Sequence, residues 1–66
     1  MKAPEEKPVV ELLGADGNAF SVMGIVTKAL KRAGADKEYT DKYMAEAMAS
    51  DYDNLLVVTM DYVEVS

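Results

Sequence analysis

The chain has 66 residues, contains neither cysteine nor histidine, and carries a net charge of −5. It is long enough for one domain at most, and that domain has no disulfide, no zinc site built from thiolate or imidazole ligands, and no Ser-His-Asp or Cys-His catalytic group. The acidic excess disfavours nucleic-acid binding, which depends on clustered lysine and arginine.

The N-terminal segment is polar. Residues 1–7 show no hydrophobic periodicity, so we expect a disordered tail, followed by a single compact domain over residues 8–66. The segment has no apolar stretch typical of a secretory signal, and nowhere does the chain approach about 20 consecutive apolar residues. These features predict a cytoplasmic protein with no membrane partner.

A strand is predicted directly after the tail. It begins at Pro8, a residue that the first position of a strand tolerates, and it ends at Gly14. Side chains alternate along a strand, so Val10 and Leu12 share an apolar face that we expect to meet the core. Residues 14–18 lack the spacing of a phosphate-binding loop, and we interpret them as a turn from strand to helix.

The next element is a helix over residues 19–33, with Asn18 as its N-cap and Gly34 directly after its end. Two adjacent stripes with helical spacing run along it, Val22, Val26, Ala29 and Ala33 on one and Phe20, Met23, Thr27 and Leu30 on the other. Gly24 interrupts this pattern at a cost of about 1 kcal/mol relative to alanine. We therefore expect another helix or the sheet to approach closely at Gly24.

A second helix is predicted over residues 37–49, with Asp36 as its N-cap. One face of this helix is apolar and aromatic, formed by Tyr39, Tyr43, Met44, Ala47 and Met48. Methionine adapts to irregular gaps between packed elements, so we expect four methionines to fill the core, Met23, Met44, Met48 and Met60.

The C-terminal segment admits two interpretations. Acidic residues at Asp51 and Asp53 favour a helix start, and we predict a helix over 51–60 followed by a strand over 61–65. The β-branched residues of the segment favour the alternative, a single strand over 55–65. The acidic pair lacks the glycine and the distant ligands of a calcium-binding loop, so we interpret it as a helix cap.

Together these elements predict an α+β fold in the order β-α-α-α-β, in which a two-stranded sheet packs against two or three helices. The helices cover one face of the sheet. Each strand of a two-stranded sheet has an open edge, and such an edge is a candidate for pairing with a second copy of the chain.

Charge is unevenly distributed along the sequence. Residues 28–42 carry a net charge of +2, whereas residues 51–66 contain four acidic side chains and no basic one. The basic region, together with one tyrosine that combines apolar area with a polar tip, supplies the candidate interaction residues Lys28, Lys31, Arg32, Lys37 and Tyr62. We predict no catalytic residue, no cofactor-binding residue and no metal ligand.

Two segments resemble known proteins, "VVELLGADGNAFSVMGIVTKALKRAG" and "EAMASDYDNLLVVTMDYVEV". They resemble a family of short uncharacterised proteins of bacteria and phages that carry motifs of the type "DGNAF" and "SDYDNLL", and the resemblance covers residues 9–65. The chain departs from the family's pattern at Ala49-Ser50, where a glycine is absent, and at Tyr62, where tryptophan is frequent. The resemblance implies a compact α+β domain in a bacterium or phage and no catalytic residue.

The small size, the open strand edges and the uneven charge predict a small interaction or regulatory module that binds another protein or forms a homodimer. The alternative is a nucleic-acid-associated factor that uses the basic region 28–42, although the net charge and the lack of interleaved aromatic residues disfavour it. We do not expect an enzyme, because a catalytic carboxylate pair needs a pocket that shifts its pKa values, and so short a chain seldom encloses one.

Overall fold

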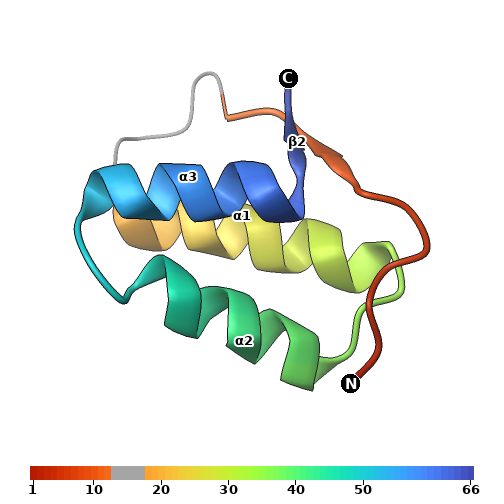
Figure 1. Ribbon diagram of the computed structural model, residues 1–66. Coiled ribbons are helices and arrows are strands. Elements are labelled where there is room, and N and C mark those ends of the chain that lie inside the picture. Colours follow the sequence, from red (N-terminus) through yellow and green to blue (C-terminus); the bar gives the residue numbers. More distant parts are fainter. Residues whose placement is uncertain (13–17) are drawn as a thin grey trace.

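A computed structural model describes residues 1–12 and 18–66 of the chain (Figure 1). Its elements, in chain order, are β1 (Val9–Val10), α1 (Ala19–Arg32), α2 (Lys37–Ala47), α3 (Tyr52–Tyr62) and β2 (Glu64–Val65). The predicted α+β fold and the order β-α-α-α-β are confirmed. The predicted strand end at Gly14 and the turn that follows it lie outside the described residues. The description resumes at Asn18.

The two strands pair in parallel, with Val10 opposite Val65. The Glu64 amide donates a hydrogen bond to the Pro8 carbonyl at 2.9 Å, and the Ser66 amide donates one to the Val10 carbonyl at 2.8 Å. Parallel strands need a long crossover connection, which the three helices supply. The first and last elements of the chain therefore lie side by side.

Each helix begins directly after the residue that the sequence predicts as its N-cap. The Asn18, Asp36 and Asp51 side chains accept hydrogen bonds from backbone amides two or three residues further along, at 2.8 to 2.9 Å. Such caps satisfy amides that the first helical turn leaves unpaired. Gly34, directly after the C-cap of α1, has a φ of 105°, a conformation that side chains other than glycine rarely adopt.

The elements form three layers (Figure 1). The sheet lies over α1 and α3, with β1 next to α1 and β2 next to α3, while α2 packs against the opposite side of this helix pair. The predicted core position of Val10 is confirmed, and Leu12 packs against the same core. Among residues 1–12 and 18–66, the buried apolar side chains form one cluster, Val10, Val22, Met23, Val26, Leu30, Ala35, Tyr43, Ala47, Leu55, Tyr62 and Val63.

Residues 55–60, which the sequence leaves open between helix and strand, are helical. The helix α3 continues two residues beyond its predicted end, to Tyr62. Leu55, Thr59 and Tyr62 recur at helical spacing and are all buried, so a helix brings all three to the core at once. This packing overrides the strand preference of the β-branched residues.

The predicted close approach at Gly24 is wrong. Gly24 is exposed on α1, and no described atom lies within 4 Å of the place that a Cβ would take. It is two residues from both Val22 and Val26, which are buried, so it lies on the opposite side of the helix from the core.

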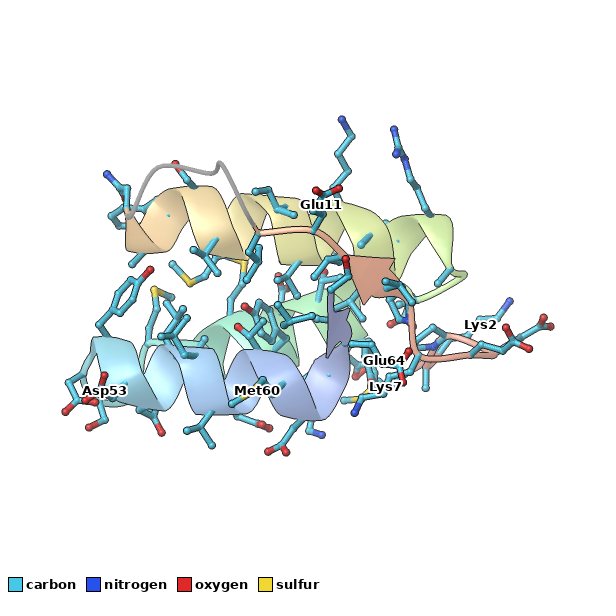
Figure 2. All side chains as sticks on the ribbon, turned by 90° about the horizontal axis from the view of Figure 1, so that it is seen from above. Lys2, Lys7, Glu11, Asp53, Met60 and Glu64 are labelled. Atoms are coloured by element: carbon cyan, nitrogen blue, oxygen red, sulfur yellow. The ribbon has the colours of Figure 1, made fainter. Side chains whose placement is uncertain are left out.

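The predicted core is also wrong at Met48 and Met60, and Phe20 of the predicted helical stripe is exposed as well. Phe20, Met48 and Met60 are 73%, 53% and 54% exposed. Phe20 and Met48 lie at helix ends, where neighbouring helices no longer cover them, and Met60 lies on the outer side of α3 (Figure 2). Met23 is buried and Met44 packs against the core, as predicted.

The N-terminal segment contacts the start of α2. The Lys2 amide donates a hydrogen bond to the Asp36 carboxylate at 2.8 Å, and the Asp36 amide donates one to the Lys2 carbonyl at 3.1 Å. The N-terminal ammonium lies 3.3 Å from a carboxylate oxygen of Glu38. The disorder expected for residues 1–7 stays a prediction.

Candidate interaction surface

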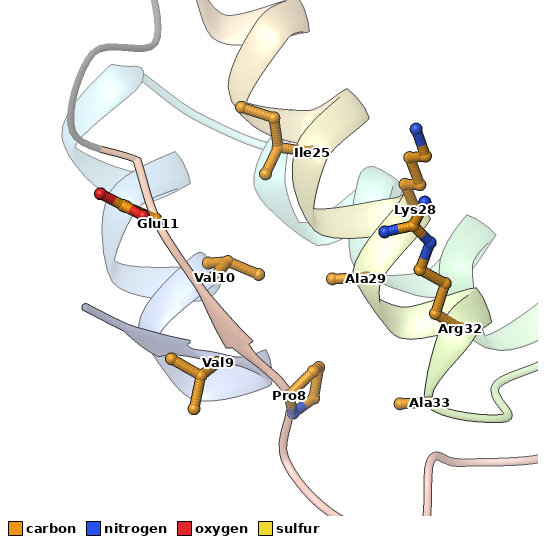
Figure 3. Close-up of a pocket in the computed structure, with 9 residues that line it drawn as sticks. All are labelled: Pro8, Val9, Val10, Glu11, Ile25, Lys28, Ala29, Arg32 and Ala33. Atoms are coloured by element: carbon orange, nitrogen blue, oxygen red, sulfur yellow. The ribbon is translucent and has the colours of Figure 1, made fainter.

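An open groove of about 470 Å³ separates β1 from α1 (Figure 3). It is lined by Pro8, Val9, Val10, Glu11, Ile25, Lys28, Ala29, Arg32 and Ala33. Pro8 lies toward Ala33 at one end, and Glu11 lies toward Ile25 at the other, so strand and helix run along the groove in opposite directions. Ala29 and Ala33 are small, and they leave space that larger side chains would fill.

β1 presents an unpaired backbone edge to this groove. The carbonyls of Pro8 and Val10 accept hydrogen bonds from β2. Backbone groups alternate in direction along a strand, so the amide and carbonyl groups of Val9 and Glu11 point away from β2. Within residues 1–12 and 18–66, no hydrogen bond across the groove uses these groups. The edge is therefore available to a further strand.

Lys28 and Arg32 stand at the side of the groove, one helical turn apart on α1 (Figure 3). In the part of the chain that the structure describes, neither side chain forms an ion pair. Among the described residues that line the groove, Glu11 is the one that is acidic. The groove thus has a local positive charge on a protein whose net charge is −5.

The other basic candidates do not join this surface. Lys31 is exposed on α1 but does not line the groove. Lys37 pairs with Asp41 at 3.3 Å, one turn along α2. Lys42 likewise pairs with a glutamate one turn further on, at 3.7 Å. The structure therefore divides the basic region 28–42 and brings only two of its cations to the groove.

Tyr62 lies in the core, with 7% of its surface exposed. Its ring makes edge contacts with the rings of Tyr39 and Tyr43, with centroids 5.4 and 5.1 Å apart. Burial raises the pKa of Tyr62, and the Lys42 ammonium, 5.5 Å from the ring centroid, opposes that rise. No described group is in good hydrogen-bond geometry with the buried hydroxyl. The position of Tyr62 favours packing between α2 and α3 over contact with a partner.

A second apolar area lies where sequence reasoning does not place one. Phe20, Met48 and Tyr52 are exposed around a hollow of about 210 Å³ between the start of α1, the end of α2 and the start of α3. Their positions at helix ends are the sequence feature that could have identified them, because terminal turns are covered least by neighbouring helices. The carboxylate among the described residues that line the hollow is that of Asp51, which already caps α3.

Comparisons of the chain with family models, curated proteins and solved structures give no match. The resemblance to short bacterial and phage proteins therefore stays a prediction. Among the described residues, no three aspartate, glutamate, histidine or cysteine side chains lie close enough together to hold a metal ion. Over the same residues, no helix has the length and apolar character needed to cross a membrane.

Proposed function

We propose that this chain is a protein-interaction module that binds an extended segment of another polypeptide in the groove between β1 and α1. The observation that carries the proposal is that an open strand edge and a groove of about 470 Å³ coincide. Backbone hydrogen bonds to such an edge supply affinity, and the side chains beside it supply selectivity.

The chemistry of the groove favours binding over catalysis. General acid–base catalysis needs titratable groups held in a fixed geometry against the substrate. In the part of the chain that the structure describes, the groove offers the carboxylate of Glu11 and the cations of Lys28 and Arg32, all on exposed residues. Such side chains are suited to selecting a partner by charge.

Nucleic-acid binding through residues 28–42 receives less support. Binding to phosphate depends on several unpaired cations on one surface. Lys37 and Lys42 are each paired with an acidic side chain, and Glu11 adds a negative charge to the groove that holds Lys28 and Arg32.

Self-association is a second part of the proposal, through the open edge of β2. The amides of Glu64 and Ser66 are bonded to β1, so the backbone groups of Val65 between them point away from it. Val65, Met60 and Val9 are exposed apolar side chains around this edge. Sedimentation equilibrium tests this part, and a chain that stays monomeric at millimolar concentration would contradict it.

The main proposal is tested by site-specific photo-cross-linking in an extract of the native host. The cross-linking amino acid benzoylphenylalanine replaces Lys28, which lines the groove, or Lys31, the matched control on the same helix. We expect position 28 to attach to a defined segment of one protein, identified by mass spectrometry, and position 31 to attach to none. The groove-filling substitution Ala29→Phe should abolish the attachment. Equal products from both positions, or none from either, would contradict the proposal.

A further inference from the structure

We infer that the occupant of the groove is an acidic segment of a partner protein, which adds to β1 as a third strand and places two carboxylates, two residues apart, at Lys28 and Arg32. This inference rests on the proposed function and specifies the chemistry of the partner. Three features of the groove support it, the free backbone edge, the small side chains of α1 and the spacing of the two cations.

The free edge determines the backbone conformation of the occupant. Val9 and Glu11 direct their amide and carbonyl groups away from β2, so an added strand can bond to each of these groups without displacing an existing hydrogen bond. Antiparallel pairs are slightly more stable per residue than parallel pairs. The added strand therefore runs opposite to β1.

The helix side of the groove determines the order of side chains in the occupant. Ala29 and Ala33 leave room for a backbone, and Ile25 offers an apolar contact at one end. Since β1 runs from the Ala33 end toward the Ile25 end, a strand antiparallel to β1 passes Ile25 first and the two cations afterwards. The expected pattern is one apolar and then two acidic side chains, at alternate positions.

The spacing of the cations matches that of a strand. Lys28 and Arg32 are four residues apart on α1, which separates them by about 6 Å along the helix axis. Alternate side chains on one face of a strand are about 6.6 to 6.8 Å apart. Two carboxylates at alternate positions can therefore reach both cations at once, and an arginine can bind its carboxylate through two parallel hydrogen bonds.

Other occupants fit this groove less well. A second copy that paired through β1 with two-fold symmetry would bring its own α1, with another Lys28 and Arg32, to the same place. A nucleic acid would meet Glu11 and a protein of net charge −5. An acidic polypeptide meets cations at the side of the groove and hydrogen-bond partners at its strand edge.

The test titrates the isotope-labelled full chain with the end-blocked peptide TVTETET and follows backbone amide shifts by NMR. We expect saturable shifts at Val9 and Glu11. The peptide TVTQTQT has the same shape without the charges, and it should bind about 10-fold more weakly, since each exposed charge pair contributes about 2- to 5-fold. Alternate amides of a bound strand point toward β1, and the others point away from it. N-methylation of the amides that point toward β1 should therefore abolish binding, whereas N-methylation of the other set should not.

Matched variants of the chain locate the contact. Lys28→Ala combined with Arg32→Ala should weaken binding of TVTETET about 10-fold, whereas Lys31→Ala should change it less than about 2-fold. All three positions are exposed on a helix, where alanine is well tolerated. Equal affinity for the two peptides, equal effects of the double and control variants, or binding that tolerates both sets of N-methyl groups would overturn the inference.

The outcomes also separate this inference from the proposed function. If position 28 cross-links to a segment without acidic residues and TVTETET does not bind, the inference is overturned and the proposed function stands. If neither experiment gives binding, both are overturned. Self-association that is lost on the combined substitution of Lys28 and Arg32 would identify a second copy as the occupant and overturn the inference.

Discussion

A single buried hydrogen bond joins α2 to α3, and its removal gives a sharp test of how this small core is held together. The hydroxyl oxygens of Tyr43 and Thr59 lie 2.7 Å apart, and both side chains are completely buried. We consider Tyr43→Phe, Thr59→Val and the double variant. Each single change leaves one buried hydroxyl without its partner, whereas the double change removes both hydroxyls and nearly preserves the shape of the core.

The two single variants should differ in size of effect. A buried polar group without a partner costs about 1–3 kcal/mol. After Tyr43→Phe, the Thr59 hydroxyl can turn to a carbonyl of its own helix, so the free energy of unfolding should fall by about 1 kcal/mol. After Thr59→Val, the Tyr43 hydroxyl sits on a rigid ring and has no such alternative, so the loss should be about 2 kcal/mol. The double variant should lose less than the sum.

Urea unfolding of the four proteins, followed by circular dichroism, measures these free energies. For a chain of this size, each kcal/mol also lowers the melting temperature by about 4–8 °C. Thr27→Val is the matched control, because Thr27 bonds a carbonyl of its own helix at 3.2 Å and joins no second element. Effects of the two single changes that add to within about 0.5 kcal/mol would refute the reasoning.

Three further predictions concern glycine, aspartate and tyrosine. Gly24→Ala should raise the free energy of unfolding by about 0.5–1 kcal/mol in urea titrations, because the site is helical, exposed and open, and an unchanged or lower value would contradict this. The hydrogen bond from the Tyr39 amide lowers the pKa of Asp36 below its ordinary value of 3.8. The ionised Asp36 carboxylate therefore stabilises the folded chain above pH 3.8, and this stabilisation is lost as the pH falls through the lowered pKa. Urea unfolding at pH ~5 and ~3 should therefore show a smaller acid loss for Asp36→Asn, and an equal loss would count against it. Burial raises the pKa values of Tyr43 and Tyr62 above 10.0, because it disfavours the charged phenolate. As far as these two tyrosines are concerned, the folded chain therefore keeps its full stability below pH 10.0 and loses part of it as the pH rises through the raised pKa values. Tyr62→Phe should reduce this alkaline loss without destabilising the neutral protein, and ultraviolet absorbance should show one fewer late-ionising tyrosine.

The parts of the fold that follow from local chemistry can be predicted from the sequence. Asn18, Asp36 and Asp51 cap their helices through bonds that span two or three residues, so a short window of sequence contains the whole interaction. The exposure of Met60 could not be read in this way. Its surroundings depend on which side of α3 meets α2 and the sheet, and that contact joins residues far apart in the sequence.

The candidate site shows the same division. Lys28 and Arg32 stand out in the sequence as cations one turn apart, but the groove beside them exists only because β1 pairs with β2 and runs alongside α1. The separation of Lys37 from this surface could have been predicted, since Asp41 follows it at the spacing of a helical ion pair. The burial of Tyr62 required the tertiary contacts of α2 and α3.

The parallel pairing of the first strand with the last also constrains the order in which the protein folds. Val9 finds its register partner only at Glu64, beyond all three helices in the sequence. Each helix forms from contacts between residues that are close together in the chain, whereas the sheet requires the whole connection between the two strands to close. Contacts between residues so distant in sequence form slowly, so we expect the sheet to form after the helices.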